Sequence, residues 1–268
     1  MIVLKTLDRD QLAVNIMNMF DTKDWDRIRA WFPNLKECPT CQGTQIYTYQ
    51  GADYACDCQT QILLAKLYHG GNIPKDYHVL KYDDLISEDR DVLIAAIDDY
   101  VDNIKHYLYY GMGLTFSGDI GTGKTLGAAL IGKELLKSGY PVYFVAFNDL
   151  IHAWGNRWND EEARWLDTKL RAVSILIIDE LATDSRNHSG FLTNGLESIV
   201  RFRTSNNKPT IITTNLASEQ EKKIFKKSFS LLSVCNKRVE TLGEDVRGKE
   251  IRERRHALAA AGERRPLC

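Results

Sequence analysis

The chain has 268 residues, enough for one or two domains, and a composition typical of a folded protein. Its 35 Lys and Arg residues nearly balance 36 Asp and Glu, which excludes binding to nucleic acid through overall positive charge alone. The longest apolar runs, such as residues 175–178, are far shorter than the ~20 residues of a membrane-spanning helix, and the N-terminus lacks the apolar segment of a signal peptide. We therefore expect a cytoplasmic protein with no membrane contact.

The N-terminal part of the chain differs in pattern from the rest. Residues 1–37 carry apolar positions near helical spacing as far as Pro33, and residues 59–68 predict another helix. Four cysteines lie between these two stretches, and the Gly-rich stretch 70–74 is the strongest break in the first half. We expect a helical and cysteine-containing module over residues 1–69, a larger domain over 70–250, and a basic, frayed tail over 251–268.

Strands and helices are predicted to alternate after this break. Short apolar segments rich in β-branched or aromatic residues predict strands over residues 114–117, 141–147, 174–179 and 209–214. Helical patterns cover residues 91–107, 124–138, 150–154, 161–171 and 195–204. Such alternation is typical of a parallel sheet with helices on both faces, so the expected fold class is α/β.

A glycine-rich loop follows the first of these strands and begins a helix. It fits the pattern G-x-x-x-x-G-K-[ST] with Gly118, Asp119, Ile120, Gly121, Thr122, Gly123, Lys124 and Thr125. The glycines allow a tight turn whose N–H groups point at phosphate oxygens, and the helix N-terminus adds its dipole. Lys124 can reach the β- and γ-phosphates, and Thr125 can bind Mg²⁺. The alternative, a chance glycine-rich turn, is disfavoured by the flanking strand and helix.

Polar side chains end two of the later strands. Asp179 and Glu180 close the strand at 174–179, where Asp179 could hold Mg²⁺ and Glu180 could polarise an attacking water. Asn215 follows the strand at 209–214 and could hydrogen-bond that water or the γ-phosphate. An exposed carboxylate pair and an ordinary turn asparagine are the alternatives.

These motifs, in this order, resemble those of the AAA+ ATPases. The resemblance is closest to the DnaC/DnaI-type replicative helicase loaders and their relative, the IstB transposition ATPase, and it runs over about residues 70–250. The residues that carry it are Gly71-Asn72-Ile73-Pro74 with Tyr77, the loop 118–125, residues 177–180, residues 208–215 and Gly243-Glu244-Asp245-Val246-Arg247.

The resemblance implies a role for each matching residue. The Walker residues for ATP and Mg²⁺ would be Lys124, Thr125, Asp179 and Glu180, and the first sensor would be Asn215. The adenine would have Ile73, Pro74 and Tyr77 as neighbours. Arg247 would be a second sensor or a trans-acting arginine. These ATPases assemble so that an arginine of the next subunit completes the ATP site, which implies a homo-oligomer in the ATP-bound state.

One motif departs from the family pattern. Relatives carry Ser-Arg-Leu shortly before the final strand, whereas this chain has Ser230-Leu231-Leu232 there. The trans-acting residue therefore stays open among Arg201, Arg203, Lys237, Arg238 and Arg247.

The four N-terminal cysteines have the spacing of a metal site. Cys38 and Cys41 form one pair, Cys56 and Cys58 the other, and residues 46–49 and 54–55 predict hairpin arms around 50–53 that would bring the pairs together. Four thiolates suit a structural zinc ion, whose binding would supply much of the folding energy of so small a unit. A redox dithiol and unrelated buried thiols are the alternatives. The helicase-loader resemblance implies that this zinc module grips the helicase.

Two segments are candidate nucleic-acid contacts. Residues 150–159 interleave Trp154 and Trp158 with His152 and Arg157, which could stack bases and meet phosphates, and the resemblance implies single-stranded DNA as the ligand. Trp154, Trp158 and Trp165 could instead be core residues. The Lys-rich run 222–227 is either a solvated helix face or a surface that steers DNA or a neighbouring subunit.

Three functions are compatible with these patterns. The first is an ATP-dependent loader that holds a replicative hexameric helicase and delivers it to single-stranded DNA. The second is an IstB-like transposition regulator, which the zinc module disfavours. The third is a small-molecule kinase, which we disfavour because Asp179, Glu180 and Asn215 point to water as the acceptor and no basic lid is apparent.

Overall fold

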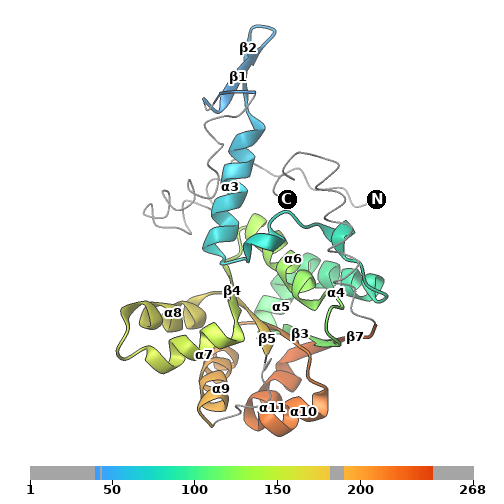
Figure 1. Cartoon of the computed structure of the whole chain (residues 1–268), viewed down its shortest axis with the longest axis vertical. Coiled ribbons are helices and arrows are strands. Elements are labelled where there is room, and N and C mark those ends of the chain that lie inside the picture. Colours follow the sequence, from blue (N-terminus) through green and yellow to red (C-terminus); the bar gives the residue numbers. More distant parts are fainter. Residues whose placement is uncertain (1–39, 43, 182–189, 244–268) are drawn as a thin grey trace.

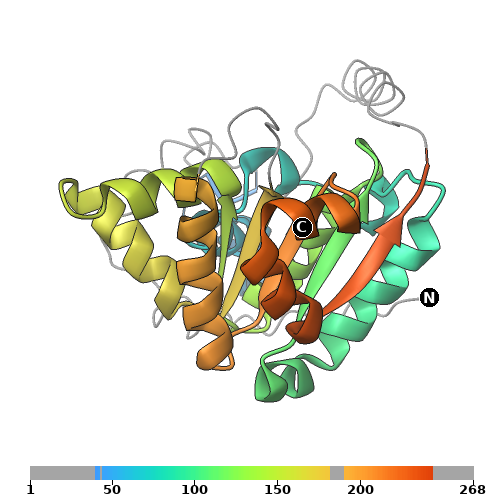
Figure 2. The ribbon, with the colours of Figure 1, turned by 90° about the horizontal axis from the view of Figure 1, so that it is seen from below.

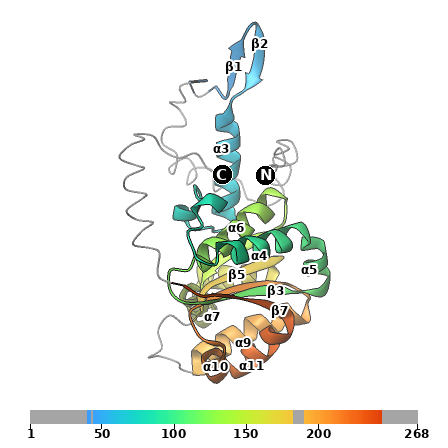
Figure 3. The ribbon, with the colours of Figure 1, turned by 90° about the vertical axis from the view of Figure 1, so that its right-hand side faces the viewer.

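A computed structural model of the chain describes residues 40–42, 44–181 and 190–243. Its centre is a five-stranded, fully parallel sheet in the order β4-β5-β6-β3-β7. The strands are β3 (Gly113–Gly118), β4 (Val142–Ala146), β5 (Ile175–Leu181), β6 (Thr210–Thr214) and β7 (Asn236–Thr241). Helices cover both faces of the sheet (Figures 2 and 3). The predicted α/β class is therefore confirmed.

Alternation along the buried strands divides the apolar residues between two cores. On β5, Ile175 and Ile177 belong to one core, whereas Leu176 and Ile178 belong to the other, and all four are fully buried. Successive side chains of a strand point to opposite faces, so a strand buried on both faces needs apolar residues at every position. The run of apolar residues before Asp179 meets that need.

The helices fall into two layers (Figure 3). One layer contains α3 (Asp57–Gly70), α4 (Arg90–Asp102), α5 (Ile104–Tyr110) and α6 (Lys124–Lys137), and two short 3₁₀ helices, η3 (Lys75–Tyr77) and η4 (Tyr82–Asp84), lie in the chain between α3 and α4. The other contains α7 (Phe147–Asn156), α8 (Glu161–Ala172), α9 (Gly190–Ser205), α10 (Ser218–Ile224) and α11 (Lys226–Cys235). Within the described part of the chain, no helix is long and apolar enough to cross a membrane.

Several elements differ from the sequence expectations or were not predicted. The predicted helix 91–107 is interrupted at Asn103, which ends α4 and precedes α5. Strand β7 is a half-exposed edge strand with Lys237, Arg238 and Glu240, so it lacks the apolar run that reveals the inner strands. Helices α10 and α11 meet at Phe225, which is buried while the lysines around it are exposed.

The cysteine region forms a hairpin that stands away from the sheet (Figure 1). Its strands, β1 (Ile46–Tyr49) and β2 (Ala52–Ala55), pair antiparallel and are joined by Gln50 and Gly51, both with positive φ. Two such residues are typical of a type I′ turn. The predicted hairpin is confirmed, with a two-residue turn in place of the expected four. Helix α3 follows the hairpin, and its Leu64, Leu67 and Tyr68 are buried in the same core as the apolar residues of α6.

Several predicted features lie outside the described residues. They are the helical segments in residues 1–37, Cys38, Arg247 and the tail 251–268. The division at residues 69 and 70 stays a prediction, because α3 belongs both to the cysteine region and to the core of the larger domain.

Candidate nucleotide and metal sites

The glycine-rich loop connects β3 to α6 at the carboxyl edge of the sheet. Gly118 ends β3 with a φ of 143°, and a Cβ at this position would collide with the carbonyl oxygen of Thr241 on β7. Gly123 has a φ of 85° where α6 begins. The loop therefore needs glycine at both points, once for close approach and once for a left-handed backbone. This turn directs the first N–H groups of α6 toward the site, where they can bind an anion.

Lys124 is buried inside this loop. Its ammonium donates to the carbonyl oxygen of Gly118 at 3.0 Å, to that of Asp119, and to the Thr122 hydroxyl at 3.2 Å. These oxygens hold the ammonium within the loop, where its positive charge favours an incoming phosphate. Lys124 thus lies where the predicted role requires it.

Asp179 lies on β5, which β6 separates from β3, and it is within hydrogen-bonding reach of the start of α6. Its carboxylate accepts a hydrogen bond from the Thr213 hydroxyl at 2.5 Å and another from Thr125. Burial raises the pKa of Asp179, and these hydrogen bonds oppose part of the rise. The oxygens of Thr125 and Asp179 are therefore together, and such hard ligands fit Mg²⁺.

Glu180 lies beside Asp179 in an unusual backbone conformation. Its φ is 56°, and the pairing of β5 with β6 shifts register between Ile178 and Leu181. The side chain is exposed and lines the same pocket as Lys124 and Thr125. The two carboxylates predicted from sequence are thus brought to one place.

A pocket of about 260 Å³ lies over the loop. Its lining comes from the chain segment before α4, the loop with the start of α6, and the ends of β5 and β6; it includes Tyr77, Leu80, Leu85, Gly121, Thr122, Gly123, Lys124, Thr125, Glu180, Thr213 and Asn215. Ile73 is buried in the core behind this wall and does not line the pocket. Gly118, Asp119 and Ile120, at the start of the loop, do not line the pocket, and Ile120 is half exposed. Asp179 does not line it either.

Sequence reasoning did not single out two side chains that hold the residues around the pocket. Thr213 bonds to the Asp179 carboxylate, and the buried Lys133 of α6 donates to the carbonyl oxygens of Tyr77, His78 and Leu80 at 3.1, 3.2 and 2.6 Å. Lys133 therefore holds the wall that faces the pocket. The only sequence signal was a lysine amid the apolar residues of α6.

The neighbouring His78 is also buried in this wall. Its Nε2 lies 2.8 Å from the carbonyl oxygen of Ile73. Burial lowers the pKa of His78 to about 4, and the nearby Lys133 charge contributes in the same direction. The imidazole is therefore neutral near pH 7 and donates to the Ile73 oxygen.

The sequence matches the family described as "IstB-like ATP binding protein" over residues 106–244, more than half of the chain. This chain belongs to the IstB-like family. The family is one of P-loop ATP-binding proteins with the AAA+ fold, in agreement with the loop and the sheet order described above. Among curated proteins, none matches the sequence.

Solved structures similar to this IstB-like chain share its fold. The DnaC helicase loader is 23% identical with a TM-score of 0.55, over 63% of this chain and 99% of that chain. DnaI is 20% identical with a TM-score of 0.52, over 63% and 94%. DnaA from Aquifex aeolicus bound to AMPPCP is 17% identical with a TM-score of 0.52, over 70% and 57%.

The arginines of this IstB-like chain differ sharply in their surroundings. Arg203 is fully buried, and its guanidinium donates to four backbone carbonyls and to the Thr210 hydroxyl, at the edge of the sheet opposite the glycine-rich loop. It cannot reach the ATP site of another subunit, so Arg203 is removed from the trans-acting candidates. Arg201 is exposed and pairs with Glu197 at 2.9 Å, and Arg238 pairs with the buried Glu221. These ion pairs do not show which of the two, Arg201 or Arg238, would act on the ATP site of a neighbouring subunit.

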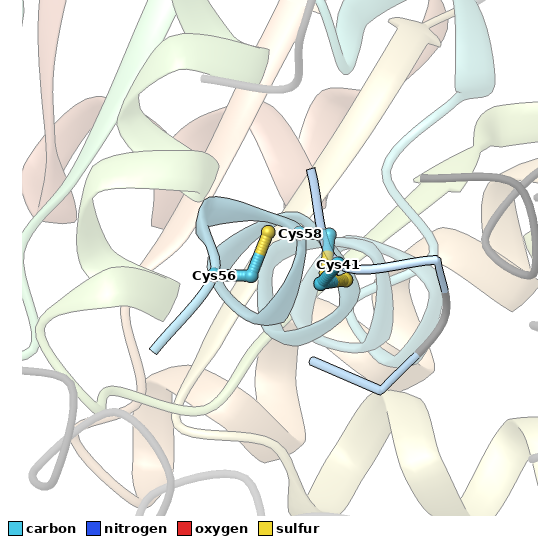
Figure 4. Close-up of side chains that lie close together, drawn as sticks. All are labelled: Cys41, Cys56 and Cys58. Carbon is cyan, nitrogen blue, oxygen red and sulfur yellow. The ribbon is translucent and has the colours of Figure 1, made fainter. Parts of the chain in front are cut away.

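Three of the four predicted metal ligands lie together at the N-terminal end of α3 (Figure 4). The sulfurs of Cys41, Cys56 and Cys58 are all within 4.8 Å of one another, and those of Cys41 and Cys58 are 3.5 Å apart. Four thiolates around zinc at ~2.3 Å would be ~3.8 Å apart, so this geometry fits the ion. Burial and hydrogen bonds with the other two cysteines raise the pKa of the Cys58 thiol. A bound cation would offset that effect.

The tryptophans near α7 and α8 are mostly outside the core. Trp158 is 75% exposed and Trp165 56% exposed, which excludes a core role for both. The Arg157 guanidinium lies 4.5 Å from the Trp154 ring centroid and 5.0 Å from that of Trp158. Trp154 is half-buried, whereas the exposed Trp158 ring beside a cation is suited to stacking on bases.

Proposed function

We propose that this protein is an ATP-hydrolysing helicase loader. It binds a replicative hexameric helicase through its N-terminal zinc module, residues 1–69, and delivers it to single-stranded DNA. The observation that carries the proposal is the meeting of Lys124, Thr125 and Glu180 in one pocket, with Asp179 hydrogen-bonded to Thr125 beside it. The fold that carries this pocket is shared with the DnaC helicase loader.

In the proposed reaction, each residue acts through its position in the pocket. Lys124 and the N–H groups of the loop would neutralise the β- and γ-phosphates. Thr125 and Asp179 would hold Mg²⁺, which would supply further stabilisation of the developing charge. Glu180 accepts a proton from the attacking water, and Asn215 orients that water or the γ-phosphate. Tyr77 contacts the nucleoside side of the pocket.

The zinc module would supply the partner contact. Cys38 would complete the ligand set of Cys41, Cys56 and Cys58, and a closed four-sulfur site holds the hairpin without doing chemistry. The hairpin exposes large apolar side chains at Ile46, Tyr49 and Tyr54. Exposed aromatic and apolar side chains on a projecting element are typical of protein-binding surfaces.

The DNA contact and the oligomer belong to the same proposal. The Trp154–Arg157–Trp158 stack would meet bases of single-stranded DNA, while Lys222, Lys223, Lys226 and Lys227 form an exposed basic face that can attract phosphate. In the ATP-bound homo-oligomer, Arg201, Arg238 or Arg247 of a neighbour would complete the site.

The proposal is tested by binding to a replicative helicase from the same source, with and without ATP, measured as the mass of the complex. A truncated chain should begin at residue 57, since Leu64, Leu67 and Tyr68 are part of the core and must be kept. We expect a stoichiometric complex that is lost on truncation and in Cys41→Ser but retained in Cys235→Ser, a matched thiol far from the cluster. If the truncated chain still bound the helicase, the N-terminal zinc module would not be the part that binds it.

The transposition alternative is less favoured, because the similar structures include the DnaC helicase loader and the replication initiator DnaA. It would be supported by the absence of any helicase complex together with ATP-dependent filaments on DNA.

A further inference from the structure

The end of β5 poses a geometric problem for two adjacent carboxylates. Successive residues of a regular strand point to opposite faces, so Asp179 and Glu180 would normally be separated by the sheet. Here Glu180 has a φ of 56°, and the register with β6 shifts between Ile178 and Leu181. This local change lets both side chains reach the same site. A left-handed backbone is unfavourable for glutamate, so something must hold it.

Thr213 on β6 contacts both residues at this point. Its hydroxyl donates to Oδ1 of Asp179 at 2.5 Å and accepts a hydrogen bond from the Glu180 N–H at 3.0 Å. The side chain is 1% exposed, so water does not compete for either bond. A hydroxyl has one proton to donate and lone pairs to accept, and both capacities are used here.

We propose that Thr213 is the positioning residue that holds the Asp179 carboxylate and the Glu180 backbone in the arrangement required for ATP hydrolysis. This inference rests on the proposed hydrolysis. Thr213 acts through its two neighbours and does not itself touch the reacting atoms. Its loss lets Glu180 return to an extended backbone, which directs the carboxylate away from the γ-phosphate.

The neighbouring threonine cannot take over this task. The Thr214 hydroxyl accepts from the N–H of Leu216 at 3.0 Å and lies 3.4 Å from the Leu181 carbonyl oxygen. It belongs to the opposite side of the strand, because side chains alternate. The assignment is therefore specific to position 213.

The test compares Thr213→Val with Thr213→Ser in the full-length protein, with single-stranded DNA present. Valine keeps the shape and removes both hydrogen bonds, so we expect kcat to fall at least ~10-fold, a part of the contribution of a positioned general base. The dissociation constant for ATP without Mg²⁺ should stay within ~2-fold, since binding by the loop is unaffected. Serine keeps the hydroxyl and should restore kcat to within ~3-fold of the wild type.

Two controls separate positioning from general destabilisation. Thr115→Val removes another buried strand hydroxyl, which accepts from Asn236 at 3.0 Å outside the pocket, and should leave kcat unchanged. If Thr213→Val does not fold, the pair Thr213→Ala and Thr213→Ser differs only by the hydroxyl and replaces it. The proposal would be overturned if Thr213→Ser lost as much kcat as the variants without a hydroxyl. It would also be overturned if Thr213→Val and Thr115→Val had the same kcat.

A second readout does not require turnover. Asp179 must be held in place for Mg²⁺ to strengthen ATP binding, so Thr213→Ala should lose most of that Mg²⁺-dependent gain and Thr213→Ser should keep it. A wild-type protein that binds Mg²⁺-ATP without hydrolysing it would refute the proposed hydrolysis. The Mg²⁺-dependent gain would then decide the role of Thr213, and an equal gain in the Ala and Ser variants would exclude it.

Discussion

The ATP-binding core and the cysteine hairpin are stabilised in opposite ways. Every residue of β6 is buried, and the core strands are covered by helices on both faces, whereas all four residues of β2 are exposed. Burial of apolar surface can therefore stabilise the sheet but contributes little to the hairpin. Three clustered thiols lie beside its base, and in our proposal a zinc ion bound there stabilises the hairpin. The proposal thus combines a site positioned by packing with a module positioned by metal, and we expect each to survive damage to the other.

The largest expected effect is the loss of ATP binding in Lys124→Ala. Removal of the buried ammonium takes away the charge that meets the phosphates, so ATP affinity should fall by ~10²-fold or more. Zinc content should not change, because the cysteines lie at the far end of α3. Calorimetric titration with ATP measures the effect, with Lys137→Ala, on the last turn of the same helix, as the control. Unchanged affinity would mean that the loop does not bind phosphate.

Glu180→Gln should separate binding from turnover within the core. The amide cannot accept the proton of water, so hydrolysis should slow by at least ~10²-fold while ATP binding is retained. Phosphate release measured alongside nucleotide binding tests this, with the exposed Glu219→Gln on α10 as the control. Hydrolysis at the wild-type rate would remove Glu180 from the mechanism.

Cys41→Ser should produce the reverse pattern. The loss of one thiolate should release zinc, from about one ion per chain to almost none, and unfold the hairpin. The melting of the core and its affinity for ATP should be those of the wild type, since no residue of the hairpin belongs to either core. Elemental analysis and calorimetry measure both properties. Retention of zinc would contradict the metal assignment.

The smallest effect is a pH dependence confined to the core. The pKa of His78 is about 4 in the folded protein and ~6.5 in an unfolded chain, so only the unfolded chain takes up the proton as the pH falls through this interval. The stability from neutral His78 is complete above pH ~6.5 and should fall by about 2 kcal/mol between pH 7.5 and pH 5. Urea unfolding of the wild type and His78→Gln at a series of pH values measures it. If the free energy of unfolding changed with pH in the same way in the wild type and in His78→Gln, His78 would not be the origin of the pH dependence.

Sequence patterns succeeded where function or burial is encoded in consecutive residues. The loop 118–125 and the pair Asp179-Glu180 each lie in one short segment, and the apolar runs of β3 to β6 indicated their strands directly. The spacing of the cysteines likewise indicated a cluster, three members of which lie together.

The features that sequence reasoning missed depend on contacts between distant segments. Thr213 is an ordinary strand threonine until the fold places it beside Asp179, 34 residues away. Lys133 binds carbonyl oxygens of residues more than 50 positions earlier in the chain. The structural role of Arg203 is recognised only from the carbonyl oxygens that its guanidinium binds. Strand β7 was missed because an exposed edge strand has no apolar run to reveal it.

Helix α3 gives the two regions a mechanical relation. It is continuous over 14 residues, or about 21 Å, with the cysteines at one end and core residues at the other. No flexible linker lies between the end of the hairpin and the core, because Cys56 directly precedes the helix. The helix therefore acts as a stiff arm. A partner held at its tip would keep a set distance and orientation relative to the nucleotide pocket, so rotation of one ATP-binding domain against another would be transmitted to that partner as displacement.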